Sequence, residues 1–291
     1  MTEPPTWPHE VDARLLGLEI LSDEPAATRF TLEPKLCRGD GGLFGGTALA
    51  ATLASFEIVS SRPALWATVQ FVGAATQGDV IDVCTSVVAR GRYVDQLQAT
   101  ATVGGRLVFS ALGSTATRRP DGITGLGHTM PVVVPPEALE PMRPGRAGPE
   151  VEPMGHYLAS EFREIPADEA DRPGRLLMWA RVLGESTTTA ASLGFLADMV
   201  PLAVCRAVGV QGAGTSLDNT LRVGHLVDTE WVLVELDAHV ADGGYGYGVS
   251  HMWSPDGTLM ATGSQTAKLF SFDAFLAKLE GRPVTGRPGV T

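Results

Sequence analysis

Two polar side chains interrupt apolar segments of the sequence and are candidates for acid–base chemistry. Asp198 lies in an apolar stretch that predicts a helix, three residues before Pro201. A part-buried carboxylate there could accept a proton, because desolvation raises its proton affinity. It could instead cap a helix that restarts at Pro201. Gln265 lies among small and apolar strand residues, where an amide requires hydrogen-bond partners. Residue type alone leaves both a catalytic and a structural role open for each.

The remaining motifs give little support to other catalytic chemistries. The 6 histidines show no HxxxH or HExxH spacing, so the sequence predicts no metal site. The run 248–252 ends in methionine and therefore fails the GxSxG nucleophile motif. The glycine-rich run 209–214 follows a predicted helix, whereas a dinucleotide fingerprint follows a strand. Cys37, Cys84 and Cys205 form no CxxC pair, and we expect them to be small buried hydrophobes in a reducing compartment.

The composition limits the class of protein and of ligand. The chain has 291 residues, of which 44% are hydrophobic and 19% charged, so it can bury a substantial core. Its 22 basic and 33 acidic residues give a net charge of −11. This acidity argues against nucleic-acid binding and, more weakly, against any polyanionic substrate. No signal-peptide pattern is visible at the start, and no uninterrupted apolar run reaches about 18 residues. We therefore expect a cytoplasmic protein.

A segment rich in proline and glycine divides the chain into halves of similar size. Between residues 119 and 153 hydrophobic periodicity disappears, which predicts an extended connection rather than a helix or central strand. We therefore expect an N-terminal domain over 1–118, this linker over 119–153, a C-terminal domain over 154–279 and a frayed tail over 280–291.

The two halves resemble each other, which indicates an internal duplication. An offset of 152 residues pairs Thr68 with Thr220 and also aligns two glycine pairs, Gly91 with Gly243 and Gly105 with Gly257. Each of these glycines lies between strand-like runs, where a turn needs positive φ. The duplicated unit is expected to be one compact module that occurs twice in the chain.

Each half has the same predicted order of elements. Short β-like runs come first, at 14–21 and 27–32, then 157–163 and 175–183. A helix follows, at 45–59 and 188–208, and three long strands close each half. Apolar residues alternate in the runs 232–240 and 81–87, but the offset of 152 does not align the apolar positions of one run with those of the other. Either the alignment of the halves shifts by one residue there, or both faces of the strand are partly buried. This layout predicts an α+β fold with two antiparallel sheets, each wrapped around a long central helix and joined as a pseudo-dimer.

That layout is similar to the double hotdog fold, and three local motifs resemble those of the acyl-CoA thioesterase II (TesB-like) family. The run Gly42–Gly46 resembles the Phe-Gly-Gly start of the family's first helix. Leu196-Ala197-Asp198, followed by Pro201, resembles the segment that bears its catalytic aspartate. Ser216–Thr220, and later Ser264-Gln265, resemble the strands that supply its other catalytic residues. The resemblance covers nearly the whole chain except the linker and tail.

The resemblance implies a catalytic set of Asp198, Ser216 and Gln265 that positions a water molecule for attack on a thioester. A thioester is already activated, so the water needs orientation and a proton acceptor rather than a covalent nucleophile. No metal and no cofactor beyond the CoA thioester substrate are then expected. The offset pairs the set with Gly46, Ala64 and Gly113, which lack polar side chains, so we expect one site per chain.

Substrate contacts are expected from three further residues. The amides of Gly45 and Gly46 at the helix start could stabilise the thioester oxyanion, because helix N-termini carry unpaired donors. Arg222 is the candidate for binding the substrate. Contacts to CoA phosphate are expected among the arginines near the predicted site elements, namely Arg90, Arg92, Arg106, Arg181, Arg206 and Arg222.

The implied function is hydrolysis of acyl-CoA to a free acid and CoA, within lipid metabolism, by a homodimer or larger homo-oligomer. The run from Asp218 to His225 departs from the best-known branch of the family, which leaves the acyl group open. One alternative is a non-catalytic protein that binds acyl-CoA or acyl-carrier thioesters. A hotdog-fold hydratase or dehydratase is another, although the second half has no convincing Asp/His motif.

Overall fold

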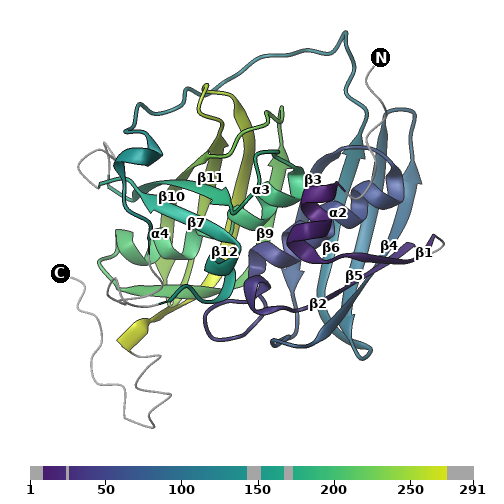
Figure 1. Ribbon diagram of the computed structural model, residues 1–291, viewed down its shortest axis with the longest axis horizontal. Coiled ribbons are helices and arrows are strands. Elements are labelled where there is room, and N and C mark those ends of the chain that lie inside the picture. Colours follow the sequence, from purple (N-terminus) through teal and green to yellow (C-terminus); the bar gives the residue numbers. More distant parts are fainter. Residues whose placement is uncertain (1–8, 24–25, 143–151, 167–172, 274–291) are drawn as a thin grey trace.

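The strands of the protein form one antiparallel sheet. The structure, a computed structural model, describes residues 9–23, 26–142, 152–166 and 173–273 (Figure 1). The first half contributes β1 (Glu19–Asp23), β2 (Ala26–Thr31), β3 (Ala64–Phe71), β4 (Val80–Arg90), β5 (Val94–Val103) and β6 (Arg106–Ala116). The second half contributes β7 (Ser160–Glu164), β8 (Arg175–Val182), β9 (Gly212–Val223), β10 (Val232–Asp242), β11 (Tyr245–Trp253) and β12 (Leu259–Ser271). The order across the sheet is β1-β2-β4-β5-β6-β3-β9-β12-β11-β10-β8-β7. Each half thus has four long strands after its helical segment rather than the predicted three.

The two halves meet at the pair β3–β9, which we call the seam. Residues 66–70 of β3 pair with residues 218–222 of β9. Thr68 lies directly opposite Thr220, and their hydroxyl oxygens are 2.7 Å apart. The two sheets expected from the sequence therefore meet edge to edge and form one continuous sheet of twelve strands.

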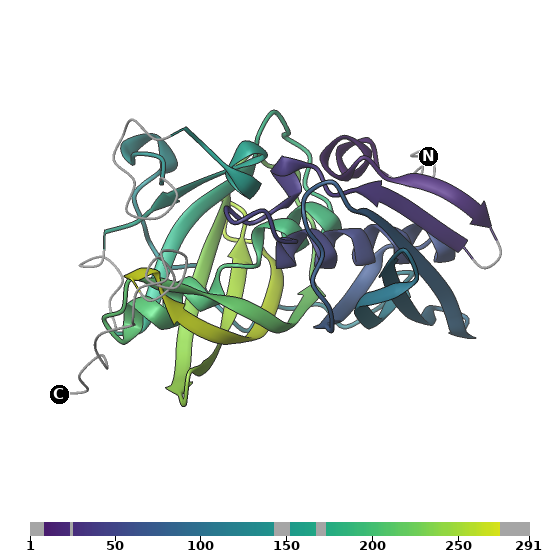
Figure 2. The same cartoon turned by 90° about the horizontal axis from the view of Figure 1, so that it is seen from below.

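Most of the helices pack against the sheet, whereas the first helix of the chain packs on two other helices (Figure 2). The helices are α1 (Glu10–Leu16), α2 (Gly45–Ser60), α3 (Ala190–Leu196) and α4 (Val200–Ala207). α2 and α3 approach closely because Gly194 has no side chain: a Cβ there would lie 2.8 Å from Leu53 Cδ1. The stretch Ala190–Ala207 is long and apolar enough to cross a membrane by composition, yet 78% of it is buried inside the protein. A buried core helix passes the same test, so this stretch is weak evidence for a membrane span.

The predicted strand at 14–21 is wrong for its first residues, which end a helix. Val11 and Leu15 of α1 are buried one turn apart, the spacing of an apolar helix face. Gly17 then takes a left-handed conformation with φ of 65°, and its amide caps the helix by bonding to Ala13 O. The strand β1 begins only after this cap.

The single helix predicted at 188–208 is also wrong, because the chain breaks it into α3 and α4. Pro201 lies in the first turn of α4, where its missing N–H costs nothing. Its ring would clash with the carbonyl of Ala197 in a continuous helix, so the two helices separate there. Asp198 lies in the turn between them, and it keeps part of its surface exposed.

The apolar positions of the two halves alternate out of step because β10 is buried on both faces. Val234 of β10 lies in the main core, whereas its neighbour Leu233 packs in a smaller cluster with Trp231 and Trp253. Linker side chains, including Val133, cover this outer cluster. The described linker residues, 119–142 and 152–153, contain no helix or strand except a 3-10 turn at Pro136–Ala138. The rest of the predicted linker and the predicted tail lie outside the described residues, and the domain limits stay a prediction.

α3 is held at its start by a capping box and by α1. Thr189 and Ser192 exchange backbone-to-side-chain hydrogen bonds of 2.9 Å, which satisfy the first turn of the helix. The Thr189 hydroxyl also donates to Asp12 Oδ1 of α1 at 2.6 Å. Asp12 is fully buried, and this burial raises its pKa to about 6. The helix that leads to Asp198 is therefore fixed through a buried acid.

We expect Asp12→Asn to flatten the pH dependence of stability. The pKa of Asp12 is higher in the folded protein than in the unfolded chain. The stability that Asp12 contributes is therefore fully present below pH 3.8, its ordinary pKa, and is lost as the pH rises through about 6. This loss amounts to at most about 3 kcal/mol by pH 7. The asparagine retains an oxygen that accepts from Thr189. Urea unfolding at pH 4 to 7 measures the slope, with the exposed Asp121→Asn as control.

Burial raises the pKa of Glu57 as well, so some slope will remain in the Asp12→Asn variant. An unfolding free energy that falls between pH 4 and 7 as steeply in Asp12→Asn as in the unaltered protein would contradict the assignment.

Candidate active site

The structure brings Asp198, Ser216 and Gln265 together at one point. Asp198 Oδ1 accepts hydrogen bonds from the Ser216 hydroxyl at 3.2 Å and from Gln265 Nε2. Gln265 Nε2 also lies within 2.8 Å of Ser216 Oγ. A third donor to the same oxygen is Asn219 Nδ2, at 3.1 Å. One carboxylate oxygen is therefore held by three side chains from β9 and β12.

A β-bulge in β9 places Ser216 and Asn219 on the same face of the sheet. Successive side chains of a strand point to opposite faces, so residues three apart normally diverge. The pairing of β9 with β12 shifts register between Ser216 and Asp218, which makes Leu217 an extra residue. The bulge reverses the alternation, and both side chains reach Asp198.

Two glycines at the start of α2 allow the helix to approach the carboxylate. A Cβ on Gly45 would lie 2.6 Å from Asp198 Oδ2 and 2.8 Å from its Oδ1, closer than van der Waals contact allows. The Gly46 amide hydrogen-bonds to Asp198. Helix N-termini favour negative charge, because their first amides lack intrahelical partners and the dipole is positive there. The Gly46 amide thus contributes to holding the carboxylate, and the oxyanion role of this pair stays a prediction.

Burial sets the acidity of the site. It raises the pKa of Asp198 to about 6, although hydrogen bonds from Ser216, Gln265 and the Gly46 amide lower it. Gln265 is only 1% exposed, and its carbonyl oxygen has no hydrogen-bond partner among the described residues. The site therefore offers a carboxylate with the proton affinity of a general base and, beside it, a buried acceptor that is available to a water molecule.

The predicted substrate residue Arg222 does not lie with this set. No bulge separates it from Asn219 in β9, so their side chains point to opposite faces of the sheet, and Arg222 is exposed. Among the other arginines expected to bind phosphate, Arg181 and Arg206 form ion pairs with glutamates, and Arg106 donates to a backbone carbonyl.

Sequence reasoning missed Asn219 and Arg38. Asparagine is depleted in strands, so a lone Asn between Asp218 and two residues that proved buried was a usable signal. Arg38 lies in the loop before α2 and forms a 2.8 Å ion pair with Asp40. Its charge lowers the pKa of Asp198, which makes it the basic group whose field reaches the site. No pattern in the loop sequence singled it out.

The corresponding position in the first half is filled by a ring. β3 and β6 set Ala67 opposite Gly113, just as β9 and β12 set Asn219 opposite Gln265 at an offset of 152. A Cβ on Gly113 would lie 2.6 Å from Phe56 Cε2 of α2. An aromatic side chain thus occupies the space that the polar pair uses in the second half.

The offset does not hold for Asp198 itself. It would pair Asp198 with Gly46, but Gly46 lies in the first turn of α2, whereas Asp198 follows the last turn of α3. The helical segments differ in length and in their break at Pro201, so an offset taken from the strands cannot carry across them. The two residues are in contact rather than equivalent.

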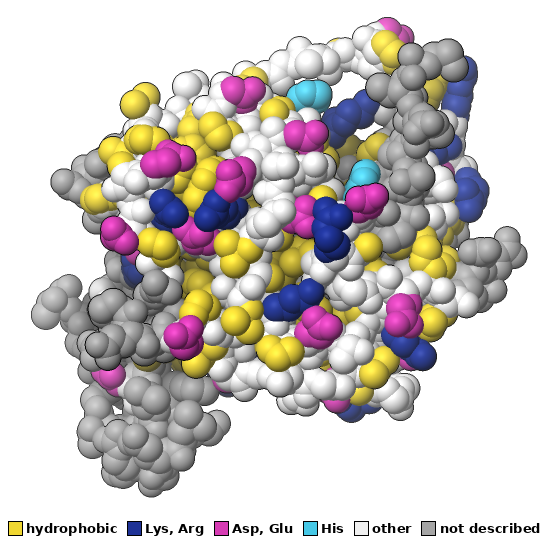
Figure 3. Space-filling model, in the orientation of Figure 1, with side chains coloured by type: hydrophobic (Ala, Val, Ile, Leu, Met, Phe, Trp, Pro, Cys, Tyr) yellow, Lys and Arg dark blue, Asp and Glu magenta, His cyan; other side chains and the backbone are white. Residues whose placement is uncertain are grey.

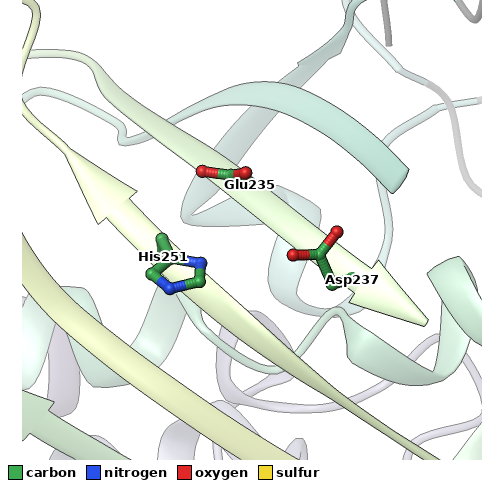
Figure 4. A group of neighbouring side chains, drawn as sticks. All are labelled: Glu235, Asp237 and His251. Atoms are coloured by element: carbon green, nitrogen blue, oxygen red, sulfur yellow. The ribbon is translucent and has the colours of Figure 1, made fainter. Parts of the chain in front are cut away.

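A second polar cluster lies on the outer face of β10 and β11. Glu235 and His251 are direct cross-strand neighbours, and Asp237 is two residues further along (Figure 4). One ligand atom from each lies within 4.8 Å of the others, a spacing that could hold a metal ion. However, Arg175 and Trp253 already donate to the two oxygens of Glu235, at 2.7 and 3.1 Å. We interpret the cluster as a charge network that fixes this face, which linear histidine spacing could not have found.

Comparisons with known proteins identify the family of the two halves. The model of the acyl-CoA thioesterase N-terminal domain matches residues 33–116, and that of the acyl-CoA thioesterase C-terminal domain matches residues 135–269. No curated protein matches the chain. A putative thioesterase from Novosphingobium aromaticivorans DSM 12444 is 29% identical, with a TM-score of 0.77 over 86% of this chain and 97% of that one.

Two more distant structures show the fold. A putative thioesterase II from Thermobifida fusca YX is 18% identical, with a TM-score of 0.76 over 88% of this chain and 98% of its own. A conserved protein of unknown function with a hot dog fold, from Alicyclobacillus acidocaldarius, is 20% identical, with a TM-score of 0.75 over 90% and 98%. The predicted hotdog architecture is thereby confirmed. Because its two halves match the two domains of one family in order, the chain belongs to the acyl-CoA thioesterase family and is a thioester hydrolase.

Proposed function

We propose that this chain hydrolyses acyl-CoA to a free acid and CoA, and that Asp198 is the general base for direct attack by water. The observation that supports this most is the unequal use of the two carboxylate oxygens. Three side chains donate to Oδ1, whereas none of the described side chains donates to Oδ2; both oxygens lie against Gly45, where a Cβ would come within 2.6 Å of Oδ2 and 2.8 Å of Oδ1. Oδ2 can then accept the proton of a water bound beside it.

The proposed reaction proceeds in two proton-balanced steps. The water donates to Asp198 Oδ2 and to the carbonyl oxygen of Gln265, and its oxygen attacks the thioester carbonyl carbon as Asp198 takes a proton. The negative charge that develops on the former carbonyl oxygen is stabilised by the Gly45 amide at the start of α2. The carbon–sulfur bond then breaks, and the departing thiolate takes the proton back from Asp198.

Ser216 and Asn219 act in this scheme by holding the base. Their hydrogen bonds to Oδ1, together with that of Gln265, fix the carboxylate in one orientation. Orientation of this kind converts a collision into an intramolecular step, which is a large part of catalysis with an activated acyl group. No residue of the set is placed as a covalent nucleophile in this proposal.

We propose one such site per chain, in a pseudo-dimer of two hotdog units. The matched registers of the halves support the duplication, while the Ala67–Gly113 pair in the first half supplies no polar counterpart. The proposal further includes that the enzyme uses no cofactor, lies in the cytoplasm, acts in lipid metabolism and assembles into a homodimer or larger homo-oligomer.

Binding of CoA requires a local positive group on an acidic protein. Acidic and basic side chains are interspersed on the face seen in Figure 3 rather than separated into a basic patch. Arg38 is the group that we propose, because its charge is felt at Asp198 and its side chain remains one-third exposed. A guanidinium can bind phosphate oxygens through two parallel hydrogen bonds.

Asp198→Asn should lower kcat by about 100-fold or more, because the amide cannot accept the proton. In the unaltered enzyme kcat/KM should fall about tenfold per pH unit below the Asp198 pKa of about 6, since protonation removes the base. Thiol release from a panel of acyl-CoA thioesters between pH 4.5 and 8 measures both effects. If Asp198→Asn turns over at the unaltered rate, Asp198 is not the base; if no thioester releases CoA, the proposed substrate class fails.

Gly45→Ala should lower kcat by about 100-fold and also lower the thermal stability, because the new methyl group must displace the hydrogen-bonded Asp198 carboxylate. Gly127→Ala is the matched control, since a Cβ there meets nothing within 4 Å. Steady-state kinetics and thermal unfolding of the two variants measure the difference. Full activity of Gly45→Ala would show that the close approach is not required.

Arg38→Gln should raise KM for acyl-CoA about tenfold and leave KM for the matching N-acetylcysteamine thioester unchanged, because that analogue lacks the phosphates. Arg222→Gln, an exposed arginine on the opposite face of β9, is the control and should alter neither. If Arg38→Gln raises KM equally for both thioesters, Arg38 acts through its charge on the active site and does not bind the CoA phosphates.

A further inference from the structure

His156 is a buried imidazole whose ring lies near the Cys37 backbone but makes no hydrogen bond of good geometry with the described residues. It is 9% exposed, and neither Nδ1 nor Nε2 has a hydrogen-bond partner among the residues that the structure describes. Burial lowers its pKa to about 3, so the ring is neutral and offers one donor and one acceptor. Buried polar groups in native proteins are nearly always satisfied, and an unsatisfied one calls for a water molecule or a ligand.

This imidazole lies one aromatic ring away from the active site. It stacks on Phe44 with ring centroids 4.1 Å apart and an interplanar angle of 5°. Phe44 immediately precedes Gly45, and a Cβ on Gly46 would lie 2.6 Å from Phe44 Cε1. The backbone that contacts Asp198 and the face of His156 thus flank the same phenyl ring.

The surroundings of His156 suit an acyl chain. Beyond Phe44 the ring contacts Tyr157 at 4.3 Å and Phe162 at 6.0 Å between centroids. Tyr157 also lines a cavity of about 160 Å³ that His156 itself does not reach; its other walls are Pro141, Met142, Pro153, Ser160, Glu161 and Leu183. Aromatic and aliphatic walls of this kind bind apolar chains, with a few polar groups that set specificity.

We propose that His156 selects acyl groups that carry a hydroxyl or oxo oxygen along the chain, an inference that rests on the proposed thioesterase function. A hydroxyl both donates and accepts, which matches a neutral imidazole. A plain alkyl chain leaves both ring nitrogens unpaired, and sites with unpaired buried polar groups discriminate strongly against such substrates. A carboxylate on the chain would require a cation, which a neutral imidazole does not provide.

The test compares chain-matched pairs of acyl-CoA, each pair consisting of a straight-chain thioester and its hydroxy or oxo analogue. The unaltered enzyme should have a higher kcat/KM for the oxygenated member of at least one pair. His156→Phe keeps the stack on Phe44 but removes both polar atoms, and it should lower that preference at least tenfold. His156→Gln, which keeps a donor and an acceptor, should retain part of it.

His239→Phe is the matched control, because His239 is exposed on β10 and contacts only Tyr247 among the ring contacts described. It should leave the preference unchanged. A preference that is equal in the unaltered enzyme, His156→Phe and His239→Phe would overturn the proposal and leave a buried water as the partner of the imidazole. If His156→Phe does not fold, His156→Gln and the unaltered enzyme decide the outcome by the same ratio.

A binding measurement separates this inference from the proposed function. If no acyl-CoA releases thiol, the proposed hydrolysis fails, and the thermal shift caused by free hydroxy acids and plain fatty acids then tests His156 alone. A larger shift with the hydroxy acid that disappears in His156→Phe supports the assignment. Equal shifts with both acids overturn it.

Discussion

The site depends on one close contact between the two halves of the chain. The carboxylate of Asp198, which follows α3 in the second half, lies against the first turn of α2 in the first half. A buried carboxylate is costly unless hydrogen bonds and a favourable field compensate it. The Gly46 amide, the helix dipole and three side chains provide both. Separating the halves would leave the carboxylate with the three side chains of its own half but without α2, so this contact makes the two units depend on each other.

Each neighbouring element then has a defined task. α2 must begin with two glycines, because any side chain at Gly45 would occupy the position of the carboxylate. The break at Pro201 keeps Asp198 in a turn, where it reaches across to α2 instead of lying within a helix. α1 fixes the start of α3 through the Asp12–Thr189 hydrogen bond. The orientation of one carboxylate thus follows from helix capping, helix breaking and the absence of two side chains.

The sequence predicted the residues of the candidate site better than the strands and helices around them. The family-like motifs named Asp198, Ser216 and Gln265, and the structure brings these side chains within hydrogen-bonding distance of each other. Asn219 escaped because strand alternation puts it on the face opposite Ser216, and only the bulge at Leu217 reverses that.

Other failures have the same origin, since they depend on pairing or packing that a linear pattern does not contain. The face that Arg222 occupies follows from the register of β9. The burial of both faces of β10 follows from a linker that covers its outer side. The broken helix is different: proline chemistry alone could have predicted that α3 stops before Pro201.

The bulge that orients Ser216 also has a counterpart with no catalytic task. β3 shifts register between Ala64 and Trp66, and β9 shifts between Ser216 and Asp218. The two bulges lie at opposite ends of the seam, whose paired residues run from 66 to 70 and from 218 to 222. Bulges end strand pairing and increase local twist. Each bulge therefore lies where the pairing of β3 with β9 ends, at the same position of the duplicated unit. Ser216 at the second bulge against Ala64 at the first, together with Asn219 and Gln265 against Ala67 and Gly113, makes the two sides of the joint chemically unequal.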